Sequence, residues 1–369
     1  MKFLAVLFFL ALSCKPAAEE PTDEGPPLGM ILEQDGTTYA GVAIIDITPQ
    51  ITETYIDANN DYMFNGCHDD PDGCLDTWTD TNGNGWFDAV WIGGFGPLRP
   101  ANGVHDPIYT RALVLSHNGE YIAFVTNDLV GVHARRITPA RDALAEDGFG
   151  ADQLIVTSSH NHQGPDTLGL WGNPILGVPG YNEDYQEFIS VSIEDAVRQA
   201  AASMEAVDFR VASVDMRDVS PWFNGANFGG KNPDKISHGM IHDGRDPVVV
   251  SDQLLVMQGI GTEGTVFTLT NWSGHPETRG GDNDQISSDW VGVEREVLED
   301  HFGGVALHMA ESLGGMQSAL GSELPLVEED GTHVYQTCDA TAIADDTDTE
   351  CYGKDEGELR VDDDGDTVP

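Results

Sequence analysis

Histidines follow two apolar segments of this sequence in a pattern that could hold a metal ion. His160 and His162 come just after the apolar residues 154–158 and are separated by a single residue. His275 follows a second apolar segment, 266–272, after a short turn of small residues. Neutral imidazole is a common zinc ligand, and a catalytic zinc site uses three protein ligands and an open position. The alternative for the first pair alone is a loop that contains two histidines by chance, because the chain has 12 histidines.

The backbone around the first pair predicts that its side chains point the same way. In an extended segment, the side chains at i and i+2 lie on one face. Ligand sites of α/β sheets lie at the carboxyl ends of strands, and Gly164-Pro165 predicts a turn directly after the pair. We therefore expect two strand ends to bring His160, His162 and His275 to one ion.

Strands and helices alternate along the sequence and must position these histidines. Apolar, β-branched runs predict strands, and helical spacing of apolar residues predicts helices. The expected strands are 39–47, 109–116, 121–126, 154–158, 209–214, 254–259 and 266–272, and the expected helices are 138–146, 183–206 and 291–300. This order predicts an α/β domain with mixed β-sheets flanked by helices.

Five segments occur in an order that matches a known family. They are residues 41–49 (GVAIIDITP), 103–112 (GVHDPIYTRA), 157–165 (TSSHNHQGP), 271–276 (NWSGHP) and 287–289 (SSD). The third is similar to the signature His-Thr-His-Ser-Gly-Pro, with Asn161 for Thr and Gln163 for Ser. Together they resemble the catalytic domain of the neutral/alkaline, non-lysosomal ceramidases.

The resemblance implies a function and a role for each histidine. It implies an α/β catalytic domain, then a small β-sandwich domain, and zinc-dependent hydrolysis of the amide of N-acylsphingosine. His160 and His275 would be zinc ligands, and His162 would be a catalytic residue that contacts the substrate or the oxyanion. The ion would activate a water for attack on the carbonyl. The family's remaining ligands, a glutamate and a tyrosine, would fall beyond residue 369, so we expect the C-terminal part of the catalytic domain to be missing.

Two segments depart from the family pattern. The family has a site arginine in an Asn-Arg-Ser-Pro stretch, whereas residues 217–221 read RDVSP, with no arginine at the matching place. Residues 314–318 (GGMQS) replace a Gly-Asp-Val-Ser/Asn-Pro element. A catalytically inactive, ceramidase-like binding or structural lipoprotein is therefore the second hypothesis. A calcium-dependent surface adhesin is the third, on account of the acidic loops alone.

Four further polar residues are weaker candidates. His105 and Asp128 could line the pocket or form hydrogen bonds at strand ends. His308 follows an apolar run, which favours a core or edge position, and Glu311 is a substitute ligand only by its nearness to His308 in the sequence.

An insertion over about 54–93 is rich in Asp, Asn, Gly and aromatic residues. Asp80, Asn82, Asn84 and Asp88 place oxygen ligands as in the first half of a calcium-binding loop. The position of the bidentate glutamate of an EF-hand is taken by Trp91. We expect a structural calcium ion here, and the alternative is an Asn/Gly turn in an acidic loop.

The first residues have the layout of an export signal. One lysine and an apolar run over 4–12 precede residues 11–14 (ALSC), which resemble a bacterial lipobox. The run is shorter than the roughly 20 residues that a membrane-spanning helix needs. We expect a signal peptide over 1–13, lipidation of Cys14, and a flexible acidic, Pro-rich tether over 14–38, with the catalytic domain over 39–369. The protein would then be anchored in the bacterial cell envelope, in the outer membrane or on the cell surface.

The charge and the cysteines limit the partners and the compartment. The net charge of −46 argues against binding to nucleic acid or to anionic lipid headgroups, and it is compatible with calcium or with a high-salt habitat. A hydrophobic content of 40% suits a globular protein. Export permits disulfides, and the remaining cysteines predict the pairs Cys67-Cys74 and Cys338-Cys351. The expected partners are a lipid or other N-acyl amide substrate and, through the anchor, a membrane.

Overall fold

Eight strands and three helices form the main body of the described protein. The computed structural model describes residues 27–67, 75–174, 177–215, 253–313, 326–327 and 333–334. The strands of the main sheet are β1 (Thr38–Asp46), β5 (Tyr109–His117), β6 (Glu120–Asn127), β7 (Leu154–Ser158), β8 (Glu205–Asp215), β9 (Gln253–Ile260), β10 (Thr265–Trp272) and β12 (Val305–Ala310). The helices are α1 (Ala134–Glu146), α2 (Glu183–Ala202) and α4 (Asp289–Phe302).

Short elements connect these. They are η1 (Pro27–Gly29), β2 (Tyr55–Ile56), β3 (Thr77–Trp78), β4 (Gly103–Val104), η2 (Ala151–Gln153), β11 (Gln285–Ile286), β13 (Leu326–Val327) and β14 (His333–Val334). β2 pairs with β3, β4 with β11 and β13 with β14. No helix in the described ranges is long and apolar enough to span a membrane.

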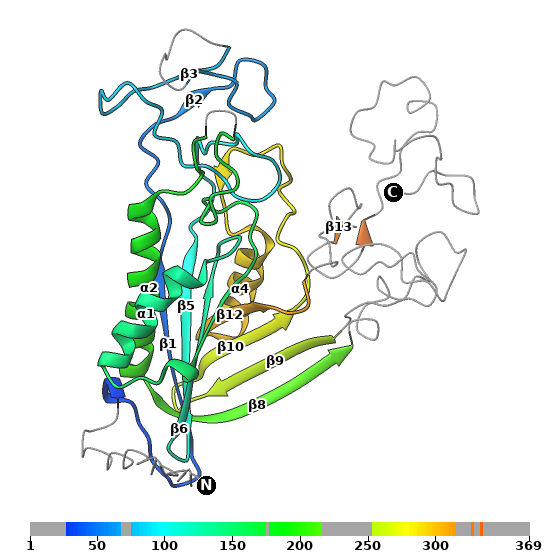
Figure 1. The fold of residues 1–369 in the computed structure, drawn as a ribbon. Helices are drawn as coiled ribbons and strands as arrows, with labels where there is room; N and C mark the ends of the chain where they lie inside the picture. The colour runs from blue at the N-terminus through cyan, green and yellow to red at the C-terminus, as the bar shows by residue number, and fades with distance from the viewer. Residues whose placement is uncertain are drawn as a thin grey trace, which may run out of the picture.

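The main sheet is mixed, as the sequence predicts. Its order is β12-β10-β9-β8-β1-β5-β6-β7. The outermost pairs, β10–β12 and β6–β7, run parallel, and the pairs between them run antiparallel. Figure 1 shows α1 and α2 on one face of the sheet and α4 beside β10 and β12. The expected α/β class with helices that flank a mixed sheet is confirmed.

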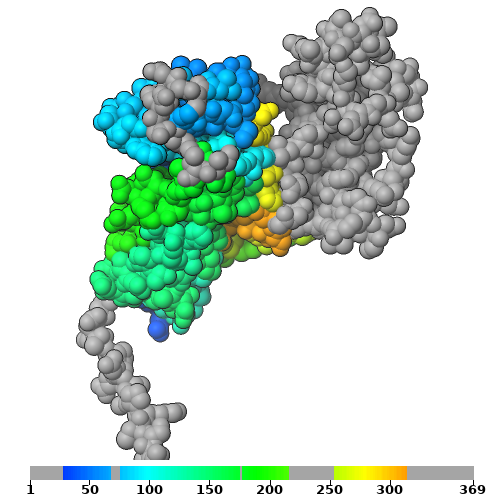
Figure 2. Space-filling model, turned by 45° about the horizontal axis from the view of Figure 1, so that its top comes forward, coloured from blue at the N-terminus to red at the C-terminus, as the bar shows by residue number. Residues whose placement is uncertain are grey.

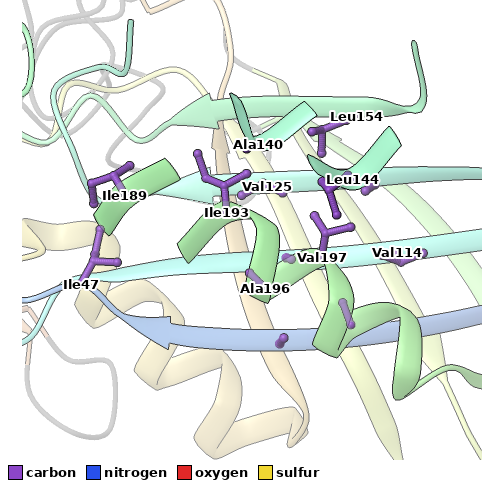
Figure 3. Close-up of a cluster of buried hydrophobic side chains, with 14 of the residues drawn as sticks. Ile47, Val114, Val125, Ala140, Leu144, Leu154, Ile189, Ile193, Ala196 and Val197 are labelled. Atoms are coloured by element: carbon purple, nitrogen blue, oxygen red, sulfur yellow. The ribbon is translucent and has the colours of Figure 1, made fainter. Parts of the chain in front are cut away.

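Helix α2 covers one face of the sheet with a continuous apolar stripe. Ile189, Ile193 and Val197 recur at helical spacing and are almost fully buried (Figure 3). They belong to one core with residues of β5, β6 and β7, among them Val114, Val125 and Leu154. Burial of such a stripe, rather than helix propensity, is the main source of helical stability.

The close approach of α2 to β1 requires a glycine. A Cβ added to Gly41 would lie 2.0 Å from the carbonyl oxygen of Ala200, so no other residue fits at this position without a shift of the helix.

The sheet curls around a second apolar core on its opposite face, and this curl brings the two edges of the sheet together. Ala40 and Leu113 of the central strands pack with Phe267, Leu269 and Leu307 of β10 and β12. β12, at one edge of the strand order, contacts β7, at the other edge, as well as β5 and β6. The ends of β7 and β10, which precede the histidines, therefore lie near each other although five strands stand between them in the strand order.

A buried ion pair joins α4 to the end of β6. Arg295 donates from Nη1 and Nη2 to the two carboxylate oxygens of Asp128, each at 2.7 Å. The side chains are 2% and 0% exposed. Two parallel charge-assisted hydrogen bonds offset part of the cost of removing both charges from water.

The insertion has a small core of its own. Tyr55, Phe64, Trp78, Phe87 and Trp91 are buried together and stack at their edges and faces. Figure 2 shows the lighter blue to cyan residues, which include the insertion, gathered at one end of the molecule. The aromatic residues that interrupt the acidic loop are therefore its structural support.

The folded domain begins before the predicted end of the tether. Met30 is 1% exposed and lies in the main core, and Ile31 accepts a hydrogen bond from the Ser116 hydroxyl. The expectation that the tether extends to residue 38 is wrong over its last residues, because their few large apolar side chains pack on the sheet.

The strand β12 was not expected from the sequence, because its six residues are too few to show a periodic pattern.

We expect the Arg295→Ala variant to lose about 3–5 kcal/mol of unfolding free energy, because it leaves the Asp128 carboxylate buried without its partner. The measurement is urea unfolding followed by circular dichroism. Arg198→Ala is the control: Arg198 is 36% exposed and pairs with Asp147 on the surface, so its loss should be about 1 kcal/mol or less. Equal losses in the two variants would show that the buried pair contributes no more to the unfolding free energy than the surface pair does.

Candidate metal centre

Three histidines converge at the ends of β7 and β10. The ring centroids of His160 and His162 are 4.8 Å apart, and that of His275 lies 5.0 Å from the first and 5.6 Å from the second. One nitrogen from each ring can be chosen so that all three lie within 4.8 Å of one another. The expectation that two distant strand ends bring their histidines together is confirmed.

The local backbone reaches this arrangement by a route that differs from the expected one. β7 ends at Ser158, and His160 has a φ of +66°, in the left-handed region that residues other than glycine seldom adopt. The expected extended geometry over His160 and His162 is therefore wrong. The turn at His160, rather than strand alternation, places both rings on the same side, and strain of this kind is often found at functional sites.

His160 has one ring nitrogen fixed by the backbone. Its Nδ1 lies 2.7 Å from the carbonyl oxygen of Val130, in the segment that follows β6. A carbonyl only accepts, so Nδ1 carries the hydrogen and donates it. The lone pair is then on Nε2, which is free to bind a metal ion.

His162 has an acidic neighbour and a close backbone contact. Its Nδ1 lies 3.0 Å from Oε1 of Glu277. Both ring nitrogens are buried, and neither has a hydrogen-bond partner among the described residues. A Cβ on Gly94 would lie 2.6 Å from the Cβ of His162, and the Phe95 ring meets the imidazole edge to face at 5.3 Å between centroids. The ring is therefore held from three directions.

Hydrogen bonds tie the two histidine segments to each other. The His162 amide donates to the carbonyl of Pro276 at 3.1 Å. The Asn161 side chain donates to the carbonyls of Ser287 at 2.6 Å and Asp128 at 3.2 Å. The indole of Trp290, in the first turn of α4, donates to the carbonyl of His275 at 3.0 Å. The asparagine that separates the two histidines thus serves as a cross-link.

A buried arginine holds the outer side of the same loop. Arg99 is 2% exposed, and its Nη2 donates to the Gln163 side chain at 3.0 Å and to the carbonyl of Asn283 at 3.1 Å. The Gln163 side chain also donates to the carbonyl of Gly280 at 2.8 Å. The residues that follow the histidine pair are therefore cross-linked to the segment that follows His275.

The environment keeps two of the imidazoles neutral. Burial lowers the pKa of His162 to about 3, with additional effects from His160, His275 and Arg99. Burial also lowers the pKa of His160, although its hydrogen bond to Val130 acts in the opposite direction. The negative charge of Glu277 likewise opposes the lowering of the pKa of His160. Neutral imidazole is the form that binds metal.

The donor set fits a zinc-type ion. Three imidazoles that are buried or partly buried, one of them with Nδ1 bonded to a backbone carbonyl, resemble the histidine sets of zinc sites. Within the described residues, this is the group of histidine, cysteine and acidic side chains close enough to hold a metal ion. The arrangement could hold an ion and leave a position for a water or a substrate.

The weaker candidates lie outside this group. His105 has a side chain that is 51% exposed, and Asp128 is the partner of Arg295. His308 is 0% exposed in β12, where its Nδ1 lies 2.8 Å from Glu294, so its expected core or edge position is confirmed. Glu311 is exposed, and its amide donates to the carbonyl of Trp272. The departures at 217–221 and 314–318 lie outside the described residues.

The proposed calcium ligands are gathered in one loop of the insertion. Asp80 accepts hydrogen bonds from the amides of Gly83 and Gly85. Asn82 and Asn84 each donate from the side-chain amide to Oδ2 of Asp88 at 2.7 Å. The side chains of Asn82 and Asn84 thus meet that of Asp88, and Asp80 binds backbone amides of the same loop, an arrangement compatible with both a calcium loop and an Asn/Gly turn.

The cysteines are described only in part. Cys67 is disulfide-bonded, and its expected partner, Cys74, lies outside the described residues. Cys14, Cys338 and Cys351 also lie outside them, so the lipidation and both pairings stay predictions.

Glu277 was not identified from the sequence. Its position two residues after His275 is the only local signal, and its contact with His162 depends on the meeting of two segments more than 100 residues apart. Val130 offers no signal at all, because a backbone carbonyl has no sequence signature.

The fold matches two solved ceramidases. One is a neutral ceramidase from Pseudomonas aeruginosa, with a TM-score of 0.54 and 16% identity, over 81% of this chain and 41% of that chain. The other is a ceramidase complexed with C2, with a TM-score of 0.53 and 17% identity, over 78% of this chain and 39% of that chain. This chain thus spans about two fifths of the length of each. No protein-family model matches the sequence.

These likenesses and the geometry agree with the resemblance drawn from the sequence segments. The chain has a ceramidase-like α/β fold, with three histidines that could hold a metal ion where the two edges of its sheet meet.

Proposed function

We propose that this protein is an exported, zinc-dependent amidohydrolase that cleaves the N-acyl amide of ceramide or of a related lipid. The observation that carries the proposal is the convergence of His160, His162 and His275 at the strand ends of a ceramidase-like fold. The pattern of sequence segments supports the same reaction. A neutral amide lipid also suits a chain with a net charge of −46, which repels anionic substrates.

The residues of the site have separate roles in this proposal. His160 and His275 hold the ion, and the carbonyl of Val130 fixes the tautomer of His160 so that Nε2 is presented. Zinc supplies polarisation of the amide carbonyl and activation of a water. The resemblance assigns His162 to the substrate or the oxyanion. Burial of the rings excludes bulk water, which strengthens each of these electrostatic interactions.

The purified protein, washed with a chelator and then reloaded, should contain about one zinc per chain. His160→Ala and His275→Ala should each lose most of it, because each removes an imidazole ligand. His117→Ala is the control, since His117 lies at the far end of β5 and bonds to Thr38. Zinc content is measured by atomic emission, with circular dichroism to verify folding.

Turnover of a fluorescent ceramide then tests the reaction. The zinc-loaded protein should release the fatty acid, and the two ligand variants should lose activity together with zinc. Zinc binding without turnover of ceramide or of simpler N-acyl amides would favour the alternative, an inactive ceramidase-like surface lipoprotein. Equal zinc content in the wild type and the two variants would rule out this metal centre.

We also propose that the protein is attached to the bacterial cell envelope through a lipid on Cys14. The signal-like residues 1–13 and the lipobox-like residues 11–14 support this. In cells, the wild type should sediment with membranes, and Cys14→Ser should move to the soluble fraction or accumulate with its signal uncleaved. Sedimentation of the Cys14→Ser protein with membranes, as in the wild type, would contradict the anchor.

The insertion loop is proposed to bind a structural calcium ion. Calcium should raise the melting temperature of the wild type, because an ion that binds only the folded state stabilises it. Asp80→Ala should abolish the increase, whereas Asp152→Ala, which removes an exposed acid elsewhere, should retain it. Scanning calorimetry with and without calcium measures both. The same increase in all three proteins would identify a nonspecific effect of charge.

A further inference from the structure

His275 lies beyond the strand that precedes it, so its direction depends on the turn that carries it. β10 ends at Trp272, before the histidine. The turn closes on itself through two backbone hydrogen bonds. The Glu277 amide donates to the carbonyl of His275 at 3.0 Å, and the Gly280 amide donates to the carbonyl of Glu277 at 2.9 Å. Neither bond connects the turn to the sheet, so contacts with other elements fix the position of the imidazole.

A buried carboxylate at the start of α4 holds this turn. Asp289 is 5% exposed, and its Oδ1 accepts hydrogen bonds from the Thr278 amide at 3.1 Å and the Thr278 hydroxyl at 2.6 Å. Its Oδ2 accepts from the Arg279 amide at 3.1 Å. Hydrogen bonds to an ionised group are roughly twice as strong as those between neutral groups. The far side of the turn is therefore fixed to the first residue of α4.

The residue after Asp289 holds the near side of the turn. The indole of Trp290 donates to the carbonyl of His275 at 3.0 Å. The Trp290 amide donates to Oδ1 of Asp289 at 2.7 Å, so the carboxylate is also bonded to the residue that contacts His275 directly. Two adjacent residues of one helix thus hold the turn at His275 and at residues 278–279.

The backbone of Asp289 is strained between the two histidine segments. Its φ is +55°, in the left-handed region that aspartate enters more readily than most residues but still seldom. Its amide donates to the Ser287 hydroxyl at 3.0 Å. The Ser287 amide in turn donates at 3.1 Å to the carbonyl of Gln163, the residue after His162. Strain of this kind is retained where the surroundings enforce it, and it is common at functional sites.

We propose that Asp289 is a positioning residue that sets the direction of His275 in the metal centre. The inference rests on the proposed zinc function and goes beyond it, because the resemblance assigns no role to residues 287–289. Asp289 is not a ligand in this proposal. An ionised carboxylate has about four acceptor sites, and donors of the turn and of α4 already occupy the group. It acts through the backbone of the residues that follow His275.

Competition with a chromophoric chelator gives the zinc affinity of the full chain without reference to activity. Asp289→Ala should weaken zinc binding about 10-fold, the lower end of the effect of removing a residue that supports a metal ligand. Asp289→Gly should weaken it as much, because glycine accepts the positive φ but also lacks the carboxylate. Asp289→Asn keeps Oδ1, with its bonds to Thr278 and Trp290, and should restore most of the affinity.

Cobalt(II) bound in the place of zinc reports the geometry of the site through its visible absorption. The spectrum of Asp289→Ala should differ from that of the wild type, because the imidazole of His275 is no longer held in one direction. Asp289→Asn should give the spectrum of the wild type. A residue that only stabilised the helix would change neither the spectrum nor the zinc affinity of the folded protein.

Two controls separate positioning from stability. Asp300→Ala removes an exposed acid from the last turn of α4 and should leave the zinc affinity unchanged. Ile193→Ala removes a buried side chain from α2, so it should destabilise the fold while the folded protein keeps the zinc affinity of the wild type. Urea unfolding of the metal-free proteins measures the stability, and circular dichroism verifies that each variant is folded.

The outcomes separate this inference from the proposed function. A wild type without zinc would overturn the zinc function and the inference together. A zinc-binding wild type, with the same affinity and cobalt spectrum in Asp289→Ala and Asp289→Gly, would overturn the inference alone. An equal loss of affinity in Asp289→Ala and Ile193→Ala would assign the effect to stability and overturn it as well. So would an Asp289→Asn protein as weak as Asp289→Ala, since the hydrogen bonds that it keeps would then have no effect.

Discussion

The ion pair between Asp128 and Arg295 is the constraint on which both halves of the metal centre depend. Asp128 directly follows β6. Its own carbonyl accepts a hydrogen bond from Asn161, and the carbonyl of Val130, two residues later, accepts one from His160. Arg295 lies in α4, whose first turn holds the carbonyl of His275 through Trp290. A buried pair of this kind is seldom a large net source of stability, but loss of one partner is costly. Its value here is geometric, because it fixes a helix against the strand end from which the site is built.

The sequence predicts the elements of this fold better than their arrangement. Apolar runs and helical spacing identify seven of the strands and all three helices, because each pattern is local. The order of strands depends on contacts between residues far apart, and nothing local indicates that β10 lies near one edge and β7 at the other. The meeting of their ends follows from the curl of the sheet over Phe267 and Leu307. Only the five ceramidase-like segments made that meeting predictable from the sequence.

The same contrast between local patterns and long-range contacts applies inside the site. The identity of the three histidines follows from their positions after apolar runs, but the turn at His160 does not. His160 has a positive φ, and the next residue, Asn161, donates to two carbonyls far away in the sequence. The spacing of the histidines carries no information about either feature, so it predicted an extended chain. Glu277 was missed for the same reason, since its significance depends on the ring that it meets. Long-range packing, not composition, decides which polar residues of this chain belong to the centre.

The contrast between the surface and the site also bears on function. The chain has 63 acidic residues, and one of them, Glu277, directly contacts a histidine of the centre. A strongly negative protein raises the local concentration of cations and repels anions, which favours delivery of a metal ion and selects against an anionic substrate. Within the site, burial lowers the pKa of His160 and of His162, which keeps these two imidazoles neutral and able to bind that ion. An acidic surface around a neutral, nitrogen-rich centre is therefore consistent with a metal-dependent reaction on an uncharged amide.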